Sequence, residues 1–360
     1  MKLLINSKCF TSEWINQKKE ALSGDPVLIE KVINAFALLG YLAQLRNDFV
    51  FKGGTSLIIH TDNIKRLSID IDIVFGGDIF PFEEMLSQIA AKSPFTRFEE
   101  DERGERGLPN RKHYKFFYIS SISDTEDSVL LDVVLDSIVY LPFTEEKIIR
   151  SNIFETDFDL PVKTLTIEGL LGDKLTAFAP HTIGVPFETQ KGKIMTMQVV
   201  KQLFDLGELF DIATYFDKTA ITFKETFIKE NSYHLNKHTE AEVLDDTINL
   251  CHLICLAHLK GYKPKDDINK FEDGLKKLSN HLLGVQFSIH TEAKITASKV
   301  FYIASSIKNN KHRDFKKDRF TTDKIRQIKD INLPSPYNYL NRLKSILPEA
   351  FYYIWKGIEE

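Results

Sequence analysis

Cysteine is scarce in this 360-residue chain, and positive charge does not exceed negative charge. The three cysteines, Cys9, Cys251 and Cys255, are too few for a disulfide framework, and we expect them to be buried thiols. Because 47 Lys and Arg residues face 51 Asp and Glu residues, the formal net charge is −4. No global positive field therefore favours indiscriminate nucleic-acid binding, and any such contact is expected to be local.

The sequence also offers no recognisable leader, and its patterns predict no apolar run of membrane-spanning length. The first residues, MKLLINSKCFTSEW, contain neither a continuous apolar core nor a small-residue cleavage site. We therefore expect a cytoplasmic protein with no membrane partner. The hydrophobic content of 43% allows a substantial core, and the length is sufficient for two domains.

The first 145 or so residues mix helix and strand patterns. After Asp25 and Pro26, apolar residues recur at three- and four-residue steps through residue 45, which predicts a capped helix. A second, amphipathic helix is expected over residues 81–92. Runs typical of β-strands lie around residues 49–51, 67–75, 95–98, 113–119 and 129–139.

From Leu165 to Trp355 the periodicity is almost entirely helical. The sequence therefore predicts an α+β protein with two domains. Residues 1–150 are expected to form a mixed β-sheet flanked by helices. Residues 160–360 are expected to form a helical C-terminal domain.

Two aspartates on one predicted strand form the first candidate site. Between Leu67 and Phe75, apolar residues alternate with Ser68, Asp70 and Asp72. Because side chains alternate faces on a strand, these polar residues project from one side, with the two carboxylates about 7 Å apart at the backbone. Neighbouring carboxylates repel each other, and a hard divalent cation relieves that repulsion. A polar strand facing water is the alternative for an isolated pair of this kind.

A glycine turn precedes the acidic strand. The segment Lys52-Gly53-Gly54-Thr55-Ser56 ends one predicted strand and opens a helix. In that geometry, backbone N–H groups and hydroxyls can hold phosphate. A glycine pair alone is typical of an ordinary turn. Together with the acidic strand, however, it predicts a phosphate cradle beside a metal site, the combination that phosphoryl transfer needs.

The order of these motifs resembles a known family. The string KGGTSL, then Arg66 and Ser68, then Asp70-Ile71-Asp72, is similar to the signature of the AbiEii/AbiGii toxin family, within the DNA polymerase β-like nucleotidyltransferase superfamily. The segment EGLLGDKLTAF resembles the glutamate-to-lysine helix of that family. The segment KQLFDLGELFD resembles its following basic and acidic helix. The resemblance covers about residues 30–215.

The resemblance implies a metal and nucleotide site. Asp70 and Asp72 would bind two Mg²⁺ ions, which Mn²⁺ could replace, and the substrate would be a nucleoside triphosphate (NTP). Asp132 resembles the third carboxylate of the superfamily, and Asp136, on the same predicted face, is its rival. The residues implied to contact the nucleotide are Lys52, Gly53, Gly54, Thr55, Ser56, Arg66, Ser68 and Lys174.

Two residues of the predicted helical domain would complete this site. Lys174 resembles the catalytic lysine of the family, the alternative being a surface lysine. Asp205 resembles the acidic residue of the partner helix. Lys201 and Gln202 stand where the family often has an arginine-aspartate pair, which puts the full acidic role in doubt.

The implied reaction is attack of an acceptor hydroxyl on the α-phosphate of the NTP, an EC 2.7.7-type transfer. The resemblance further implies the toxin of a bacterial toxin–antitoxin or abortive phage-infection system, with a cognate antitoxin as partner. The 3′ end of transfer RNA (tRNA) is one acceptor it suggests. Two alternatives stay open: a nucleotide-binding protein that has lost turnover, and a γ-phosphotransferase acting on a protein or small molecule.

One basic stretch is the predicted RNA contact. Residues 308–320, KNNKHRDFKKDRF, contain six Lys and Arg residues and two aspartates, and Phe315 and Phe320 lie among them. Such a stretch can bind phosphates while its aromatic rings stack on bases. The alternative is a solvated loop between helices.

Overall fold

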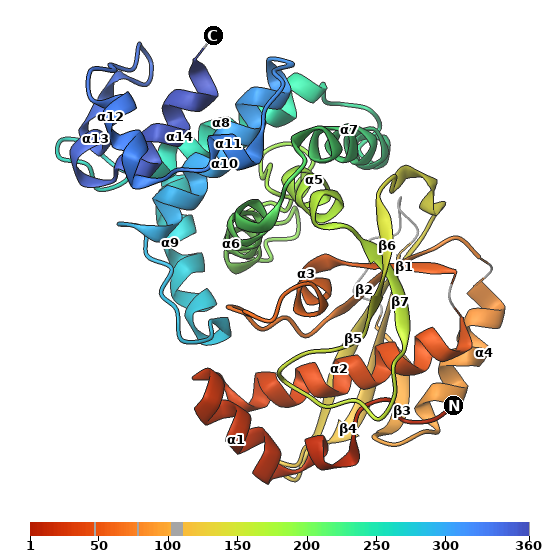
Figure 1. The fold of residues 1–360 in the computed structure, drawn as a ribbon. Coiled ribbons are helices and arrows are strands. Elements are labelled where there is room, and N and C mark those ends of the chain that lie inside the picture. The colour runs from red at the N-terminus through yellow and green to blue at the C-terminus, as the bar shows by residue number, and fades with distance from the viewer. Residues whose placement is uncertain (47, 78, 102–110, 360) are drawn as a thin grey trace. The chain divides into compact units, whose positions relative to one another are not determined.

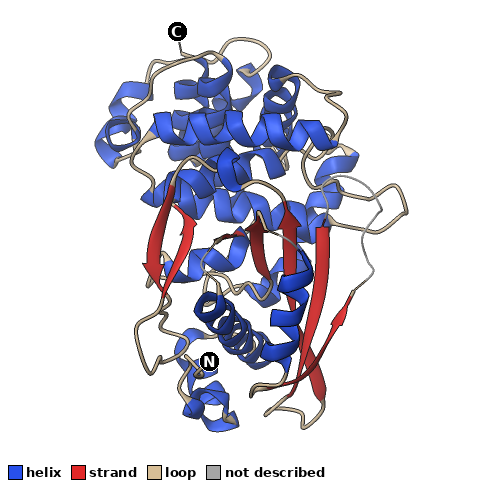
Figure 2. Ribbon diagram, turned by 90° about the vertical axis from the view of Figure 1, so that its right-hand side faces the viewer, coloured by secondary structure: helices blue, strands red, loops and turns tan. Residues whose placement is uncertain are grey.

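The computed structural model describes residues 1–46, 48–77, 79–101 and 111–359, and the chain divides into two compact units (Figure 1). Unit 1 comprises Met1–Thr166 and the later segment Asn280–Val285. Unit 2 comprises Ile167–Ser279 and Gln286–Glu360. The architecture is α+β, as predicted, because a mixed sheet in unit 1 is followed by a mainly helical region (Figure 2).

Unit 1 contains a seven-stranded sheet with the order β3-β4-β5-β2-β1-β7-β6. The β1–β7 and β2–β5 pairs are parallel, and the other four pairs are antiparallel. The strands are β1 (Phe49–Lys52), β2 (Ile71–Phe75), β3 (Phe95–Glu100), β4 (Arg111–Ile119), β5 (Glu126–Leu135), β6 (Thr144–Ile148) and β7 (Pro161–Leu165).

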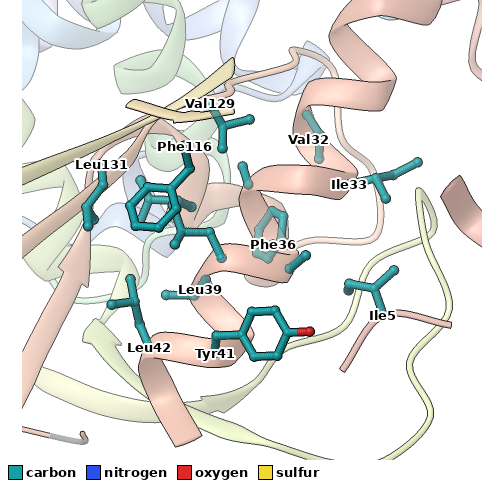
Figure 3. Packing of buried hydrophobic residues seen from close by; sticks show 14 of the residues in the cluster. Ile5, Val32, Ile33, Phe36, Leu39, Tyr41, Leu42, Phe116, Val129 and Leu131 are labelled. Atoms are coloured by element: carbon teal, nitrogen blue, oxygen red, sulfur yellow. The ribbon is translucent and has the colours of Figure 1, made fainter. Parts of the chain in front are cut away.

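The helices of unit 1 are α1 (Ser12–Leu22), α2 (Pro26–Leu45), α3 (Gly53–Ser56) and α4 (Ile79–Ala90), with 3₁₀ turns η1 (Ser7–Phe10), η2 (Leu57–Ile59) and η3 (Ile138–Tyr140). Helix α2 begins as predicted, since the Asp25 side chain accepts hydrogen bonds from the N–H groups of Val27 and Leu28. Its side chains Phe36 and Leu39 join Phe116 and Leu131 of the sheet in one buried cluster (Figure 3).

One expectation about α2 was wrong. By length and composition alone this 20-residue helix could cross a membrane, because its most apolar window has a mean hydropathy of 1.5. In the structure 72% of that window is buried. The chain therefore does contain an apolar run of membrane-spanning length. In the structure this run forms a helix in the core of unit 1.

The sheet differs from the prediction at two places. The predicted strand 67–75 begins only at Ile71, and residues 67–70 are irregular. The sheet also continues past residue 145, since β6 and β7 extend it on the β1 side. Thr164 of β7 is buried and donates a hydrogen bond from Oγ1 to Phe51 O at 2.8 Å, which ties this late strand to β1.

The irregular segment before β2 is held by residues from much later in the chain. The N–H of Leu67 donates to His281 O at 2.8 Å, and the N–H of Leu283 donates to Lys65 O at 2.9 Å. Arg66 and Leu282 form an isolated antiparallel bridge. The segment Asn280–Val285 therefore belongs to unit 1 although α9 of unit 2 precedes it.

Unit 2 is helical, and α10 packs against α6, α8 and α14 while α5 packs against α6 and α7. Cys251 and Cys255 lie on α8 and are buried, as predicted, and Cys9 of unit 1 is also buried. The helices of unit 2 are α5 (Ile167–Ala177), α6 (Thr196–Ile212), α7 (Phe216–Tyr233), α8 (Glu240–Leu256), α9 (Asp266–Leu278), α10 (Glu292–Lys308), α11 (Phe315–Asp318), α12 (Ile325–Ile328), α13 (Leu343–Ile346) and α14 (Pro348–Ile358). Its 3₁₀ turns are η5 (Thr322–Lys324) and η6 (Asn338–Arg342), while η4 (Ser279–His281) begins at Ser279 of unit 2 and ends in the segment that belongs to unit 1.

Candidate active site

Four ionisable residues stand side by side across four neighbouring strands of unit 1. Lys52 of β1 is in register with Asp72 of β2, Asp72 with Asp132 of β5, and Asp132 with His113 of β4. Residues in register on neighbouring strands project from the same face of a sheet. The row Lys52-Asp72-Asp132-His113, called the acidic row below, thus places two carboxylates at its centre and a basic residue at each end.

The opposite face of these strands is core. Phe51, Ile73 and Val133 are in register with one another on β1, β2 and β5, and all three are at most 1% exposed. A one-residue slip of any strand would move these side chains out of the core. Burial of the apolar face therefore fixes the position of the acidic row on the other face.

The register separates Asp132 from its rival Asp136. Asp132 lies within β5 directly beside Asp72. Asp136 follows the end of β5, and its N–H donates to Phe75 O at 3.1 Å, beyond the last paired residues of β2. The geometry thus brings Asp132, rather than Asp136, next to Asp72.

Asp70 sits just before β2 rather than inside it. Its backbone oxygen accepts a 2.6 Å hydrogen bond from Thr55 Oγ1, which links the segment to α3. Within the described part of the chain, no three His, Cys, Asp or Glu side chains are grouped closely enough to hold a metal ion. Mg²⁺ commonly binds one or two carboxylates and completes its shell with water and substrate phosphates. The in-register pair Asp72 and Asp132 supplies oxygen ligands of that kind.

The glycine turn lies directly against the acidic row. Gly53 has φ +78°, and a methyl group built on it would overlap Oδ2 of Asp72 and lie 2.7 Å from its Cγ. Only glycine therefore allows the Asp72 carboxylate to approach the turn this closely. Gly54 follows in α3, and no described side chain caps the start of that helix, so its first N–H groups suit an anion.

We expect Gly53→Ala to destabilise the protein by roughly 2 kcal/mol or more, because it adds a left-handed backbone penalty to the overlap with Asp72. Gly192→Ala is the matched control. Gly192 has φ +79°, but its nearest neighbour, Glu188 Oε1, is 3.7 Å from the added methyl. Urea unfolding compares the two variants, and equal losses of unfolding free energy would contradict a specific Gly53–Asp72 contact.

The hydroxyls of the turn point inward. Thr55 and Ser56 are fully buried, and Ser56 Oγ donates to Gly53 O at 2.8 Å while Thr55 donates to Asp70 O. In this structure both hydroxyls fix the turn to the acidic segment. Arg66 is 7% exposed and donates to Leu67 O at 3.1 Å, and Ser68 is half-buried.

A buried histidine lies just beyond this turn. The side chain of His60 is inaccessible to solvent, and its Nδ1 lies 3.7 Å from Oε1 of Glu145. Burial and then the nearby charge of Lys147 lower the pKa of His60 to about 4. The folded state therefore holds this imidazole neutral at pH values where the unfolded chain, with a pKa of 6.5, binds a proton.

This pKa predicts an acid-sensitive contribution to stability. The contribution is complete above pH 6.5 and is lost as the pH falls toward 4, by roughly 2 kcal/mol at pH 4.5. Urea unfolding of the wild type and His60→Leu at pH 7.5 and 4.5 tests it. The wild type should lose more unfolding free energy than the variant. Equal losses would mean that His60 is protonated in the folded state.

In unit 2 the structure brings Lys174 of α5 and Asp205 of α6 together. Lys174 Nζ lies 2.7 Å from Asp205 Oδ2, and the two side chains are only 6% and 3% exposed. Lys174 Nζ also donates to Gln202 Oε1 at 3.4 Å. The alternative of an ordinary surface lysine is therefore wrong, and Gln202 serves as a second acceptor for the ammonium.

The aromatic residues of the stretch 308–320 do not support the predicted base stacking. Phe315 is fully buried, and its ring centroid lies 5.3 Å from that of Phe210 and 5.5 Å from that of Phe216. Phe320 is half-buried, 5.5 Å from the ring of Tyr352. The prediction for Phe315 was wrong because residues 315–318 fold into the short helix α11, whose first residue packs in the core.

Part of the charge in this stretch is also used internally. The Arg313 side chain is 10% exposed and pairs with Glu359 at 3.0 Å. Arg319 donates to Ala213 O at 2.6 Å, at the end of α6. Lys316 and Lys317 are exposed. Because Arg313 and Arg319 bond within the protein, the basic surface of this stretch is smaller than its composition suggested.

His113 is the residue that the sequence analysis missed. Its Nδ1 lies 2.7 Å from Asp132 Oδ1, with side chains 25% and 32% exposed. The hydrogen bond with Asp132 raises the pKa of His113 above its usual value. On β4, Tyr114 and Phe116 are buried and point to the core, whereas His113 lies on the other face of the strand. Only the pairing of β4 with β5 shows that His113 lies beside Asp132.

The comparisons define the class of this protein as a nucleotidyltransferase. Residues 37–280 match the family model described as nucleotidyl transferase AbiEii toxin, type IV TA system. The chain therefore belongs to the AbiEii family of toxins of type IV toxin–antitoxin systems. Membership makes it an enzyme of the EC 2.7.7 type and implies an NTP substrate and an antitoxin partner.

Two solved structures from Helicobacter pylori are similar to this chain at 13% sequence identity and a TM-score of 0.42. One is JHP933, and the match covers 84% of this chain and 94% of that protein. The other is described as a candidate nucleotidyltransferase, and the match covers 84% of this chain and 100% of that protein. No protein with a curated description matches the chain.

Proposed function

We propose that this enzyme transfers a nucleoside monophosphate from an NTP to an acceptor hydroxyl at the acidic row, with release of pyrophosphate, in a reaction that depends on Mg²⁺ or Mn²⁺. The observation that carries the proposal is the register that sets Asp72 beside Asp132 on the polar face, with Gly53 against the Asp72 carboxylate. A phosphate-binding turn and paired carboxylates are the parts that this reaction requires.

Asp72 and Asp132 would hold the metal as an in-register pair, and Asp70 is proposed as a further ligand from the segment before β2. When bound, the metal neutralises charge on the triphosphate and favours ionisation of the attacking hydroxyl. The backbone N–H groups at the start of α3 would bind phosphate oxygens, and the neighbouring Lys52 adds positive charge at the same level of the sheet. The family resemblance implies that Thr55 and Ser56 contact the nucleotide. We propose that their hydroxyls do so indirectly, by holding the turn in place.

Lys174 is proposed as the cation that balances the triphosphate charge. A compact ammonium is suited to that role as a point charge. Asp205 and Gln202 hold it in place in the structure. Lys174 and Asp205 thus remain proposed catalytic residues, while Arg66 and Ser68 are proposed to support the segment that leads to Asp70.

The proposed acceptor is an RNA 3′ hydroxyl, with the tRNA 3′ end as the first substrate to test. The assay incubates the wild-type enzyme and Asp72→Asn with α- or γ-labelled NTPs, cellular RNA and Mg²⁺. Transfer of the α-label to RNA by the wild type alone is expected, and sequencing of RNA 3′ ends identifies the acceptor. Transfer of the γ-label would overturn the proposal in favour of a phosphotransferase, and NTP binding without any transfer in favour of a non-catalytic nucleotide-binding protein.

A further inference from the structure

His113 contacts the Asp132 carboxylate from β4, the strand on the other side of β5 from Asp72. On one neighbouring strand Asp72 stands in register with Asp132, and on the other His113 does. Because a carboxylate only accepts hydrogen bonds, the 2.7 Å contact means that Nδ1 of His113 carries the hydrogen. The contact uses Asp132 Oδ1, which leaves Oδ2 as the oxygen that a ligand would use.

The position of His113 is itself fixed by the sheet. Its carbonyl oxygen accepts a 2.7 Å hydrogen bond from the N–H of Asp101, and its flanking residue Tyr114 is 1% exposed in the core. The backbone of His113 is therefore fixed beside Asp132, and the 2.7 Å contact holds the ring toward that carboxylate. A donor anchored in this way restricts the rotation of the carboxylate and offsets the repulsion between Asp72 and Asp132.

We propose that His113 is a positioning residue of this enzyme, which orients Asp132 so that its second oxygen faces the metal beside Asp72. The inference rests on the proposed function, because it takes Asp132 as a metal ligand. His113 acts through Asp132 and contacts neither substrate nor metal. Hydrogen-bonded outer partners of ligating carboxylates commonly change metal affinity by about 10- to 100-fold.

The test measures Mn²⁺ binding by electron paramagnetic resonance in the absence of NTP, together with kcat and the KM for NTP at saturating metal. His113→Phe should weaken Mn²⁺ binding by roughly 10-fold or more and leave the KM for NTP near the wild-type value. His113→Asn should restore most of the affinity, because the Asn amide offers an N–H at the same place along the side chain as Nδ1. Lys112→Ala is the control, since Lys112 lies next to His113 on β4 but pairs with Glu100 at 2.5 Å from the opposite face.

A double-mutant comparison separates positioning from an independent role. If His113 acts through Asp132, His113→Phe should add no further loss of Mn²⁺ affinity to Asp132→Asn. Additive losses would overturn the proposal, as would wild-type affinity in His113→Phe alongside reduced affinity in Asp132→Asn. If Asp72→Asn and Asp132→Asn both kept wild-type Mn²⁺ affinity and nucleotide transfer, the proposed function itself would be wrong. If only His113→Phe kept wild-type affinity, the positioning role of His113 would be wrong while the proposed function stood.

Discussion

Asp72→Asn is expected to lower nucleotide transfer by roughly 1000-fold or more while leaving the protein folded. Asp72 is one of the two central carboxylates of the acidic row, and losing several kcal/mol of metal-dependent stabilisation in the transition state corresponds to such a factor. Because asparagine has the same shape and removes one of two repelling charges, the free energy of unfolding should stay unchanged or rise slightly. The affinity for Mg²⁺ should fall as well. Label transfer, urea unfolding and calorimetric Mg²⁺ titration measure the three quantities.

Asp136→Asn is the matched control for this variant. It makes the same chemical change at a carboxylate that lies past the end of β5. Transfer by Asp136→Asn should remain within a few-fold of the wild type. A full loss in Asp136→Asn with normal turnover in Asp132→Asn would mean that the third carboxylate has been assigned to the wrong residue.

Lys174→Ala is expected to reduce the free energy of unfolding by roughly 3–5 kcal/mol, because it leaves Asp205 buried without its cationic partner. The two side chains are 6% and 3% exposed, so water can compensate little of the loss. The double variant Lys174→Met with Asp205→Leu should recover most of the stability, since an apolar pair replaces a buried ion pair at little cost. Urea unfolding of the three proteins measures the effect.

The same variants separate stability from catalysis. If Lys174 also balances triphosphate charge, the stable double variant should still show weak NTP binding. A loss below about 1 kcal/mol in Lys174→Ala would show that Asp205 finds another partner or becomes protonated at little cost. Normal NTP affinity in the double variant would limit Lys174 to a structural role.

Much of unit 1 could be predicted from local patterns. The Asp25 cap and the apolar periodicity after Pro26 predict α2 correctly, and the glycine turn after Phe51 is found where β1 ends. The start of β2 could not be predicted in this way. Residues 67–70 alternate like a strand, yet the backbone just before them, at residues 65–67, bonds with residues 281–283 in place of a neighbouring strand.

The candidate site shows the same limit. Asp72 could be identified from the strand pattern and the preceding turn, but the choice between Asp132 and Asp136 depends on how β5 pairs with β2. His113 depends on the pairing of β4 with β5 as well. Such register is set by burial of the apolar faces of several strands at once, so no single segment contains it.

The base stacking predicted for Phe315 was wrong for a related reason. The composition of the stretch 308–320 suggested an exposed basic surface, but composition does not show which face of a one-turn helix packs inward. The buried ring of Phe315 and the internal bonds of Arg313 and Arg319 come from contacts with α6, α7 and the end of the chain. Charge-removing substitutions at Arg313 or Arg319 would therefore change folding before they changed any RNA contact.

The segment Asn280–Val285 has a consequence for how the enzyme is made. Its backbone supplies partners for Lys65 and Leu67, on the approach to Asp70, from more than 200 positions further along the chain. During synthesis, the N-terminal sheet can form while this approach still lacks its late partners, because α5 to α9 must be made first. A newly made chain is thus expected to acquire the complete setting of Asp70 only after helices α5 to α9 exist, which delays the formation of a competent toxin until residues 280–285 have been made.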